Sequence, residues 1–186
     1  MINNDIRIIS ACNQEWEGQT HCDNLSFSGV GKVNATIHTM KIIRVHKPKL
    51  IINYGTGASK HFKGELVDCN KFIQGDMNVE ALGFNQGVTP YEDDIPMLLD
   101  YSQSDIINPL KYNLTCYTGD KFRTPSQYED VVDMEAYAIA KVCYLHNVDF
   151  ISYKYITDDG SADDWVSNCY KGTEQFKDVL KSYLDI

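Results

Sequence analysis

The residues of this chain best suited to chemistry are carboxylates placed where apolar runs end. Asp133 and Glu135 close the run in "VVDMEAYAIA", Asp158 follows "FISYKYIT", and Glu15 comes shortly after "IRIIS". Carboxyl groups at such junctions act as general acids or bases, accept hydrogen bonds from a ligand's hydroxyl groups, or simply start a helix. The pattern alone leaves these three interpretations open.

The elements that must position these carboxylates alternate between strand and helix. β-branched runs predict strands at 6–10, 49–59, 64–73, 113–119, 129–134 and 148–157. Helical spacing of Val33, Ile37 and Met40 predicts a helix that ends before Pro48. Further helices are expected at 135–147 and in the last dozen residues, whereas 74–110 is rich in loop signals. The chain is therefore expected to form one α/β domain over 1–186, with a largely parallel sheet.

In such a sheet, ligands gather at the carboxyl ends of the strands. The four stretches "ACNQE", "YGTGAS", "YTGDKF" and "TDDG" all follow predicted strands. In the second of them, glycine lets the backbone of Thr56 and Gly57 come close to a ligand oxygen. We therefore expect one site at this edge of the sheet.

Composition excludes several classes of partner. The formal net charge of −9 argues against nucleic acid and anionic membrane surfaces. The six cysteines form no C-x-x-C pair and are expected to be reduced thiols in a soluble, cytoplasmic protein.

Three ligand motifs fail on their spacing. "GVGK" lacks the phosphate-loop pattern because Ser26 and Val33 stand where glycine and Ser or Thr are required, so it is expected to be a glycine turn that opens a helix. "DDGSADD" places Gly160 too early for a calcium loop, and the five histidines have no zinc-ligand spacing. We expect no metal and no cofactor.

Five stretches together resemble the purine nucleoside phosphorylase/nucleosidase superfamily, in the order typical of that family. They are "SGVGKVNAT", "IINYGTGAS", "YTGDKF", "VVDMEAYAIA" and "YITDDG", and the resemblance covers about residues 6–160. Among the branches, the chain is most similar to the nucleosidases that act on methylthioadenosine and S-adenosylhomocysteine. The resemblance implies a three-layer α/β/α fold with a largely parallel or mixed sheet, and cleavage of an N-glycosidic bond with release of adenine.

The resemblance also implies the catalytic residues. Asp158 matches the family's general acid, which must hold a proton near neutral pH to protonate the departing purine. Glu15 falls where nucleosidases keep a glutamate that activates water, with Glu17 as a close competitor.

Substrate-binding residues follow from the same motifs. Glu135 matches the glutamate that accepts hydrogen bonds from the ribose diol, and Met134 matches a methionine that packs on the sugar. Phe122 is expected to stack on the base, with a core position as the alternative, and the backbone of Arg123 to contact the purine edge. Asp133 is expected to support the site through an ion pair with Lys154.

A phosphorylase and an inactive nucleoside-binding protein remain as alternatives. Against phosphorolysis, Asn53 and Tyr54 stand where phosphorylases place an arginine for phosphate. The segment containing Leu82, Phe84 and Pro90 resembles a lid that reaches a neighbouring subunit, which would imply a homodimer; a simple intramolecular loop is the other interpretation.

Overall fold

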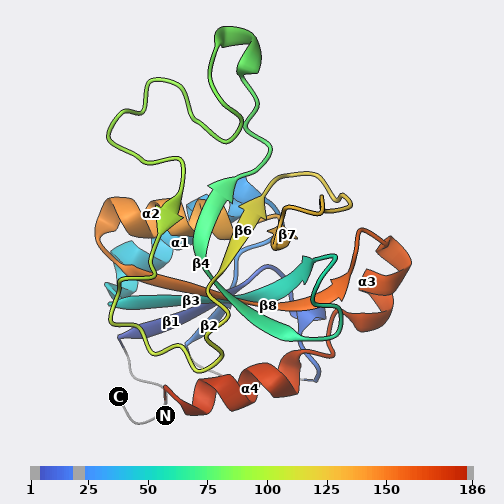
Figure 1. Cartoon of the computed structure of the whole chain (residues 1–186). Coiled ribbons are helices and arrows are strands. Elements are labelled where there is room, and N and C mark those ends of the chain that lie inside the picture. Colours follow the sequence, from blue (N-terminus) through green and yellow to red (C-terminus); the bar gives the residue numbers. More distant parts are fainter. Residues whose placement is uncertain (1–4, 19–23, 184–186) are drawn as a thin grey trace.

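The computed structural model describes residues 5–18 and 24–183 of the chain (Figure 1). The strands are β1 (Ile6–Ser10), β2 (Leu25–Phe27), β3 (Leu50–Ala58), β4 (Leu66–Gln74), β5 (Leu99–Asp100), β6 (Leu114–Thr118), β7 (Val131–Asp133) and β8 (Asp149–Asp158). The helices are α1 (Lys32–His46), α2 (Ala136–His146), α3 (Ala162–Asn168) and α4 (Thr173–Lys181). Two short 3₁₀ turns, Asn13–Glu15 and Glu80–Leu82, complete the elements. Most of the predicted elements are therefore present.

The strands form one mixed sheet. Its order is β2-β1-β3-β7-β6-β4-β5, and β8 pairs with both β3 and β4. The β1–β2, β1–β3, β3–β8, β4–β6 and β6–β7 pairs are parallel, whereas β4 runs antiparallel to β8 and β5. Because β1, β3 and β8 lie side by side in parallel, their carboxyl ends meet at one edge, as expected for a ligand site.

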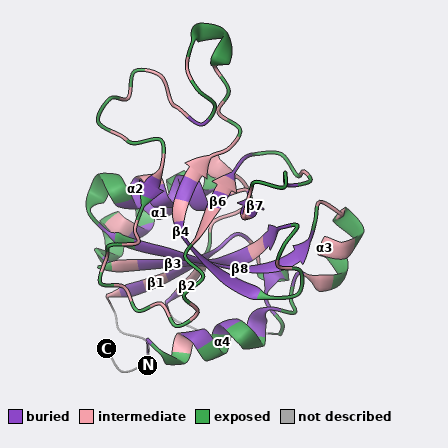
Figure 2. Cartoon of the chain, viewed as in Figure 1, coloured by how far each residue is buried: buried purple, intermediate pink, exposed green. Residues whose placement is uncertain are grey.

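Helices cover both faces of this sheet. Ile9 and Ile51 belong to a core cluster with residues of α1 and α2, whereas their neighbours Ile8 and Ile52 belong to a second cluster with Phe176 of α4. Successive side chains of a strand point to opposite faces, so the two clusters are the two sides of one sheet (Figure 2). The three-layer α/β/α arrangement is confirmed, with the sheet mixed.

Helix α1 turns its predicted apolar row away from the core. Val33, Ile37 and Met40 are 69%, 65% and 45% exposed, and the buried side of the helix carries Ala35, Thr39 and Ile42 instead. The spacing identified the helix correctly, but the row that it marked forms an exposed apolar surface. The expected glycine turn does open this helix, with Gly31 as the residue before its first turn.

Strands β2 and β5 and helix α3 were not predicted, and the two-residue β5 lies in the stretch 74–110 that was expected to be rich in loops. Strand β2 is only three residues long and contains a serine, so it carried no periodic signal. Helix α3 begins inside the acidic stretch "DDGSADD", which was expected to be a solvated loop with a helix-start acid, and the hydroxyl of Ser161 accepts a hydrogen bond from the Asp164 N–H. The predicted C-terminal helix ends at Lys181, and positions 184–186 of the prediction lie outside the described residues.

No helix within the described ranges is long and apolar enough to cross a membrane. Cys12, Cys69, Cys116, Cys143 and Cys169 carry free thiols, and Cys22 lies outside the described residues.

Candidate active site

A cavity of about 300 Å³ opens where the carboxyl ends of β1, β3, β7 and β8 meet. This volume lies at the lower end of the range that holds small-molecule ligands. The predicted site residues that line it are Glu15, Thr56, Gly57, Phe122, Arg123, Asp133, Met134, Glu135 and Asp158. Residues far apart in the sequence thus converge on one site, as the strand ends predicted.

Glu15 is fixed by four hydrogen bonds. Its Oε1 accepts from the backbone N–H and the hydroxyl of Thr56, at 2.7 and 3.0 Å. Its Oε2 accepts from the Ala11 N–H and the Ser10 hydroxyl, each at 3.1 Å. A Cβ on Gly55 would lie 2.9 Å from Oε1, so strand β3 needs a glycine there. The carboxylate is 4% exposed and faces the cavity, whereas the competing Glu17 is exposed and does not line it.

Glu135 lies at the start of α2 and is 6% exposed. Its Oε1 accepts a hydrogen bond of 2.7 Å from the N–H of Gly31, the glycine that precedes α1. Gly31 has φ +92°, a conformation that glycine adopts without strain. Burial, and then the negative charge of Asp133, raises the pKa of Glu135 to about 8, although Lys154 opposes the shift.

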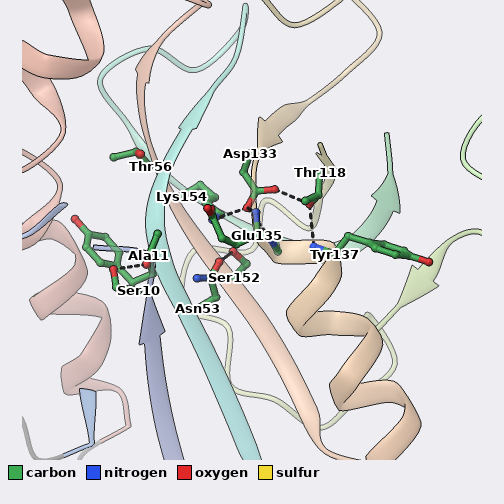
Figure 3. A network of polar contacts seen from close by, with 12 residues as sticks. Ser10, Ala11, Asn53, Thr56, Thr118, Asp133, Glu135, Tyr137, Ser152 and Lys154 are labelled. Carbon is green, nitrogen blue, oxygen red and sulfur yellow. Dashed lines mark hydrogen bonds and ion pairs between the residues drawn. The ribbon is translucent and has the colours of Figure 1, made fainter. Parts of the chain in front are cut away.

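Asp133 forms the expected ion pair with Lys154, and both side chains are buried. The Lys154 Nζ lies 2.8 Å from Oδ2, and Thr118 donates its hydroxyl to Oδ1 at 2.5 Å (Figure 3). The Ala136 N–H, in the first turn of α2, also donates to Oδ2 at 2.8 Å. Burial opposes ionisation, but the Lys154 charge and these hydrogen bonds outweigh it and lower the pKa of Asp133. The pair therefore anchors the β7–α2 junction that carries Glu135.

Asp158 ends β8 at the cavity and is 1% exposed. Its Oδ2 accepts from the Thr157 hydroxyl at 2.6 Å, and its Oδ1 accepts from the Gly160 N–H at 2.7 Å. The carboxyl group is thus held in one orientation, and the neighbouring Asp159 is exposed.

At the rim, Phe122 is 47% exposed and lines the cavity, so its interpretation as a core residue was wrong. The Arg123 side chain points to Glu129, with Nη1 2.7 Å from Oε2 and a second contact between Nη2 and Oε1. That pairing occupies the guanidinium group. The resemblance assigns the backbone of Arg123, and not its side chain, to the purine edge.

Comparisons with known proteins show the family of the chain. The model of the "Phosphorylase superfamily" matches residues 24–185. The chain belongs to the phosphorylase superfamily. A 5′-methylthioadenosine/S-adenosylhomocysteine nucleosidase of Haemophilus influenzae (strain PittEE) is 33% identical over 154 residues, which are 72% of this chain and 66% of that protein. One of Staphylococcus haemolyticus is 32% identical over 162 residues, covering 75% of this chain and 70% of the relative.

Solved structures of the superfamily show the same fold. The Helicobacter pylori nucleosidase with butyl-thio-DADMe-Immucillin-A has a TM-score of 0.79 at 19% identity, and 97% of each chain is covered. The Streptococcus pyogenes S-adenosylhomocysteine nucleosidase with 5-methylthiotubericidin has a TM-score of 0.74 at 20% identity, again with 97% of each chain covered. The chain nevertheless spans just under two thirds, 66%, of the length of the Haemophilus influenzae relative.

Leu82, Phe84 and Pro90 do not line the cavity of this superfamily member. They belong to the segment between β4 and β5, which projects away from the body of the molecule (Figure 1). Leu82 is 68% exposed, and the Phe84 ring contacts only Tyr91 among the aromatic contacts of the described residues. Within one chain, the predicted lid leaves the cavity uncovered.

Several lining residues were not predicted. They include Cys12, Val30, Lys121 and Trp165. Trp165 reaches the cavity because α3 folds back over the end of β8, and its indole donates to the Thr56 hydroxyl at 2.9 Å. The "SADD" stretch matches the S-x-x-D/E signal for a helix start and would have revealed α3.

Removing Lys154 should destabilise the protein strongly. Lys154→Met leaves the Asp133 carboxylate buried without its counter-ion, which typically costs about 3–5 kcal/mol. Urea unfolding of wild type, Lys154→Met and the double variant Asp133→Asn/Lys154→Met measures this effect. The double variant should recover much of the loss, and a single variant as stable as wild type would show that the pair does not stabilise the fold.

The raised pKa of Glu135 predicts a pH-dependent stability. Between the ordinary carboxyl pKa of 4.5 and about 8, the folded protein holds a proton at Glu135 that the unfolded chain releases. Stability from this group is therefore highest at low pH and falls as pH rises through that window, by at most about 1.4 kcal/mol per pH unit. Glu135→Gln keeps an acceptor for Gly31 and removes the titration.

Thermal unfolding between pH 5.5 and 8.5 measures this effect as the difference between the two proteins, since groups distant from Glu135 titrate equally in both. Wild type should lose stability relative to Glu135→Gln as the pH rises. Parallel curves would contradict the shifted pKa.

Proposed function

We propose that this protein hydrolyses the N-glycosidic bond of purine nucleosides of the methylthioadenosine and S-adenosylhomocysteine class and releases adenine. The observation that carries the proposal is the convergence of three buried carboxyl groups, those of Glu15, Glu135 and Asp158, on one cavity of nucleoside size. The names of the similar nucleosidases support the choice of substrate class.

The division of labour follows from the bond that breaks. As the bond between the sugar C1′ and the purine nitrogen breaks, positive charge develops on the sugar and negative charge on the base. Asp158 donates a proton to the purine, which neutralises the leaving group. Glu135 holds the ribose hydroxyls and, in its ionised form, stabilises the cationic sugar, with Met134 against the sugar face.

Glu15 orients the attacking water and accepts its proton as the new C1′–O bond forms. Four donors hold its carboxylate in one orientation at the wall of the cavity, so the base is preset for the attacking water. On the purine side, Phe122 stacks on the ring and the backbone of Arg123 contacts its edge.

Water is favoured over phosphate as the nucleophile by the charges of the site. A phosphate beside Glu15 would face a carboxylate and would need a cation to compensate it. Lys154 is committed to Asp133 and Arg123 to Glu129. Lys154 does not line the cavity, and Lys121, which lines it together with Arg123, is exposed.

We also propose that the protein acts as a homodimer. Val30, Val33, Ile37 and Met40 form an exposed apolar row along the start of α1, and Val30 also lines the cavity. In a monomer, this row would be an apolar patch exposed to water. A twofold assembly would cover the row and would bring the partner's lid segment over the 5′-substituent.

Ile37→Glu is expected to dissociate the dimer, because it places a charge in the centre of that row. Sedimentation velocity of wild type and variant measures the change. Val45→Glu is the matched control, since Val45 is also exposed on α1 but lies off the row, and it should remain dimeric. A monomeric wild type would overturn the proposal.

The activity is tested by incubating the protein with methylthioadenosine, S-adenosylhomocysteine and inosine, and separating the products by chromatography. The proposal predicts adenine from the first two substrates and little base from the third. Binding by calorimetry without any release of base would instead identify an inactive nucleoside-binding protein.

A further inference from the structure

Both tryptophans of the chain donate their indole N–H to a hydroxyl group that contacts Glu15. The Trp16 Nε1 lies 3.0 Å from Ser10 Oγ, and the Trp165 Nε1 lies 2.9 Å from Thr56 Oγ1. The chain contains two tryptophans, so every tryptophan of the sequence makes this kind of contact. They reach Glu15 from different elements, Trp16 beside the 3₁₀ turn after β1 and Trp165 from α3.

The two hydroxyls serve the two oxygens of the carboxylate. Thr56 contacts Oε1 at 3.0 Å and Ser10 contacts Oε2 at 3.1 Å. A hydroxyl has a single proton, and an indole N–H can only donate. Each indole therefore occupies the acceptor side of a hydroxyl and leaves that hydroxyl to direct its proton at another acceptor.

The two series of contacts, from Trp165 through Thr56 and from Trp16 through Ser10, constrain Glu15 to different degrees. The Thr56 hydroxyl has one acceptor among its recorded contacts, the Glu15 Oε1. The Ser10 hydroxyl has two, since it also lies 2.7 Å from the carbonyl oxygen of Tyr54. Trp165 should therefore constrain Glu15 more strongly than Trp16 does.

We propose that Trp165, and more weakly Trp16, are positioning residues that hold Glu15 as a hydrogen-bond acceptor facing the cavity. Each indole acts through one hydroxyl on one carboxylate oxygen. The inference rests on the proposed function only in assigning Glu15 to the water that attacks the sugar. Trp165 also lines the cavity, so a ligand in the cavity would lie beside the ring that helps to orient this carboxylate.

A spectroscopic experiment tests this hydrogen-bond relay without any turnover. The indole N–H signals of ¹⁵N-labelled protein are assigned by Trp165→Phe and Trp16→Phe. Thr56→Val should move the Trp165 signal alone and Ser10→Ala the Trp16 signal alone. Glu15→Gln replaces one carboxylate oxygen by an NH₂ group and should move at least the signal on that side. Thr56→Ser keeps the hydroxyl and should leave the Trp165 signal near its wild-type position.

Steady-state kinetics test whether the loss of an indole donor slows turnover. Trp165→Phe keeps an aromatic ring and loses the donor, so the Thr56 hydroxyl can turn away from Glu15. We expect kcat to fall about 3- to 10-fold with KM within about twofold of wild type, and a smaller fall for Trp16→Phe. Tyr170→Phe, an exposed aromatic after α3 that lies outside the cavity, is the control and should match wild type.

The outcomes separate this inference from the proposed function. If Glu15→Gln leaves both indole signals in place, the relay does not exist and the inference fails, whatever the activity. If the relay is present but Trp165→Phe turns over at the wild-type rate, the indole does not position the base, and the inference also fails. If wild type releases no purine, the proposed function fails, and the indole signals still decide whether the tryptophans hold Glu15.

Discussion

Asp158→Asn is expected to lower kcat by about 10²–10⁴-fold while nucleoside binding stays close to that of wild type. The amide has nearly the same shape as the carboxyl group, but it has no proton to give to the departing purine. Its oxygen can still accept from the Gly160 N–H, and the Thr157 hydroxyl can turn to the Gly57 carbonyl, which lies 3.5 Å away. The loss should therefore appear in turnover and not in folding.

The matched control is Asp159→Asn. Asp159 is adjacent in the sequence, exposed, and does not line the cavity, so this variant should turn over like wild type. Steady-state rates and calorimetric binding of methylthioadenosine measure both variants. Full activity in Asp158→Asn would remove this residue from the mechanism.

Glu15→Gln should reduce kcat by a similar factor, because an amide cannot accept the proton of the attacking water. This variant has a second effect that Asp158→Asn lacks. Both Glu15 oxygens accept from backbone N–H groups, so the new NH₂ group must face a donor at Ala11 or at Thr56. We expect stability to fall by about 1–3 kcal/mol as well.

Activity must therefore be compared at a temperature where the variant is folded, as judged by circular dichroism. Glu17→Gln is the control, since Glu17 is exposed and should tolerate the change with wild-type turnover. If Glu17→Gln abolished turnover while Glu15→Gln did not, Glu17 and not Glu15 would be the residue that activates water.

Strong local patterns made most of the fold predictable. Strands β3 and β8 are long and rich in β-branched and aromatic residues, and α2, expected at 135–147, buries Ala136, Ile139 and Cys143. The pairing of β8 with both β3 and β4 depends on contacts between distant segments, which no local pattern encodes. The orientation of α1 was also unpredictable, because its apolar residues mark a surface and not the core.

The candidate site was predictable where its residues follow strands that the sequence itself indicates. Asp158 and Glu135 follow clear strands, and the family resemblance indicated Glu15, so the main carboxylates were named in advance and now lie around one cavity. The sequence could not reveal that Trp165 contacts Thr56, because that contact depends on how a short helix packs over a distant strand. Whether Leu82 and its neighbours form a lid depends on a second subunit.

The most direct test of the central claim, that water attacks the sugar, is the identity of the sugar product. Methylthioadenosine is incubated with the protein in phosphate-free buffer and again with added phosphate, and adenine and sugar are quantified together. We predict free methylthioribose, equal in amount to adenine, at a rate that phosphate does not raise. A requirement for phosphate, with a sugar 1-phosphate as the product, would contradict the hydrolytic mechanism.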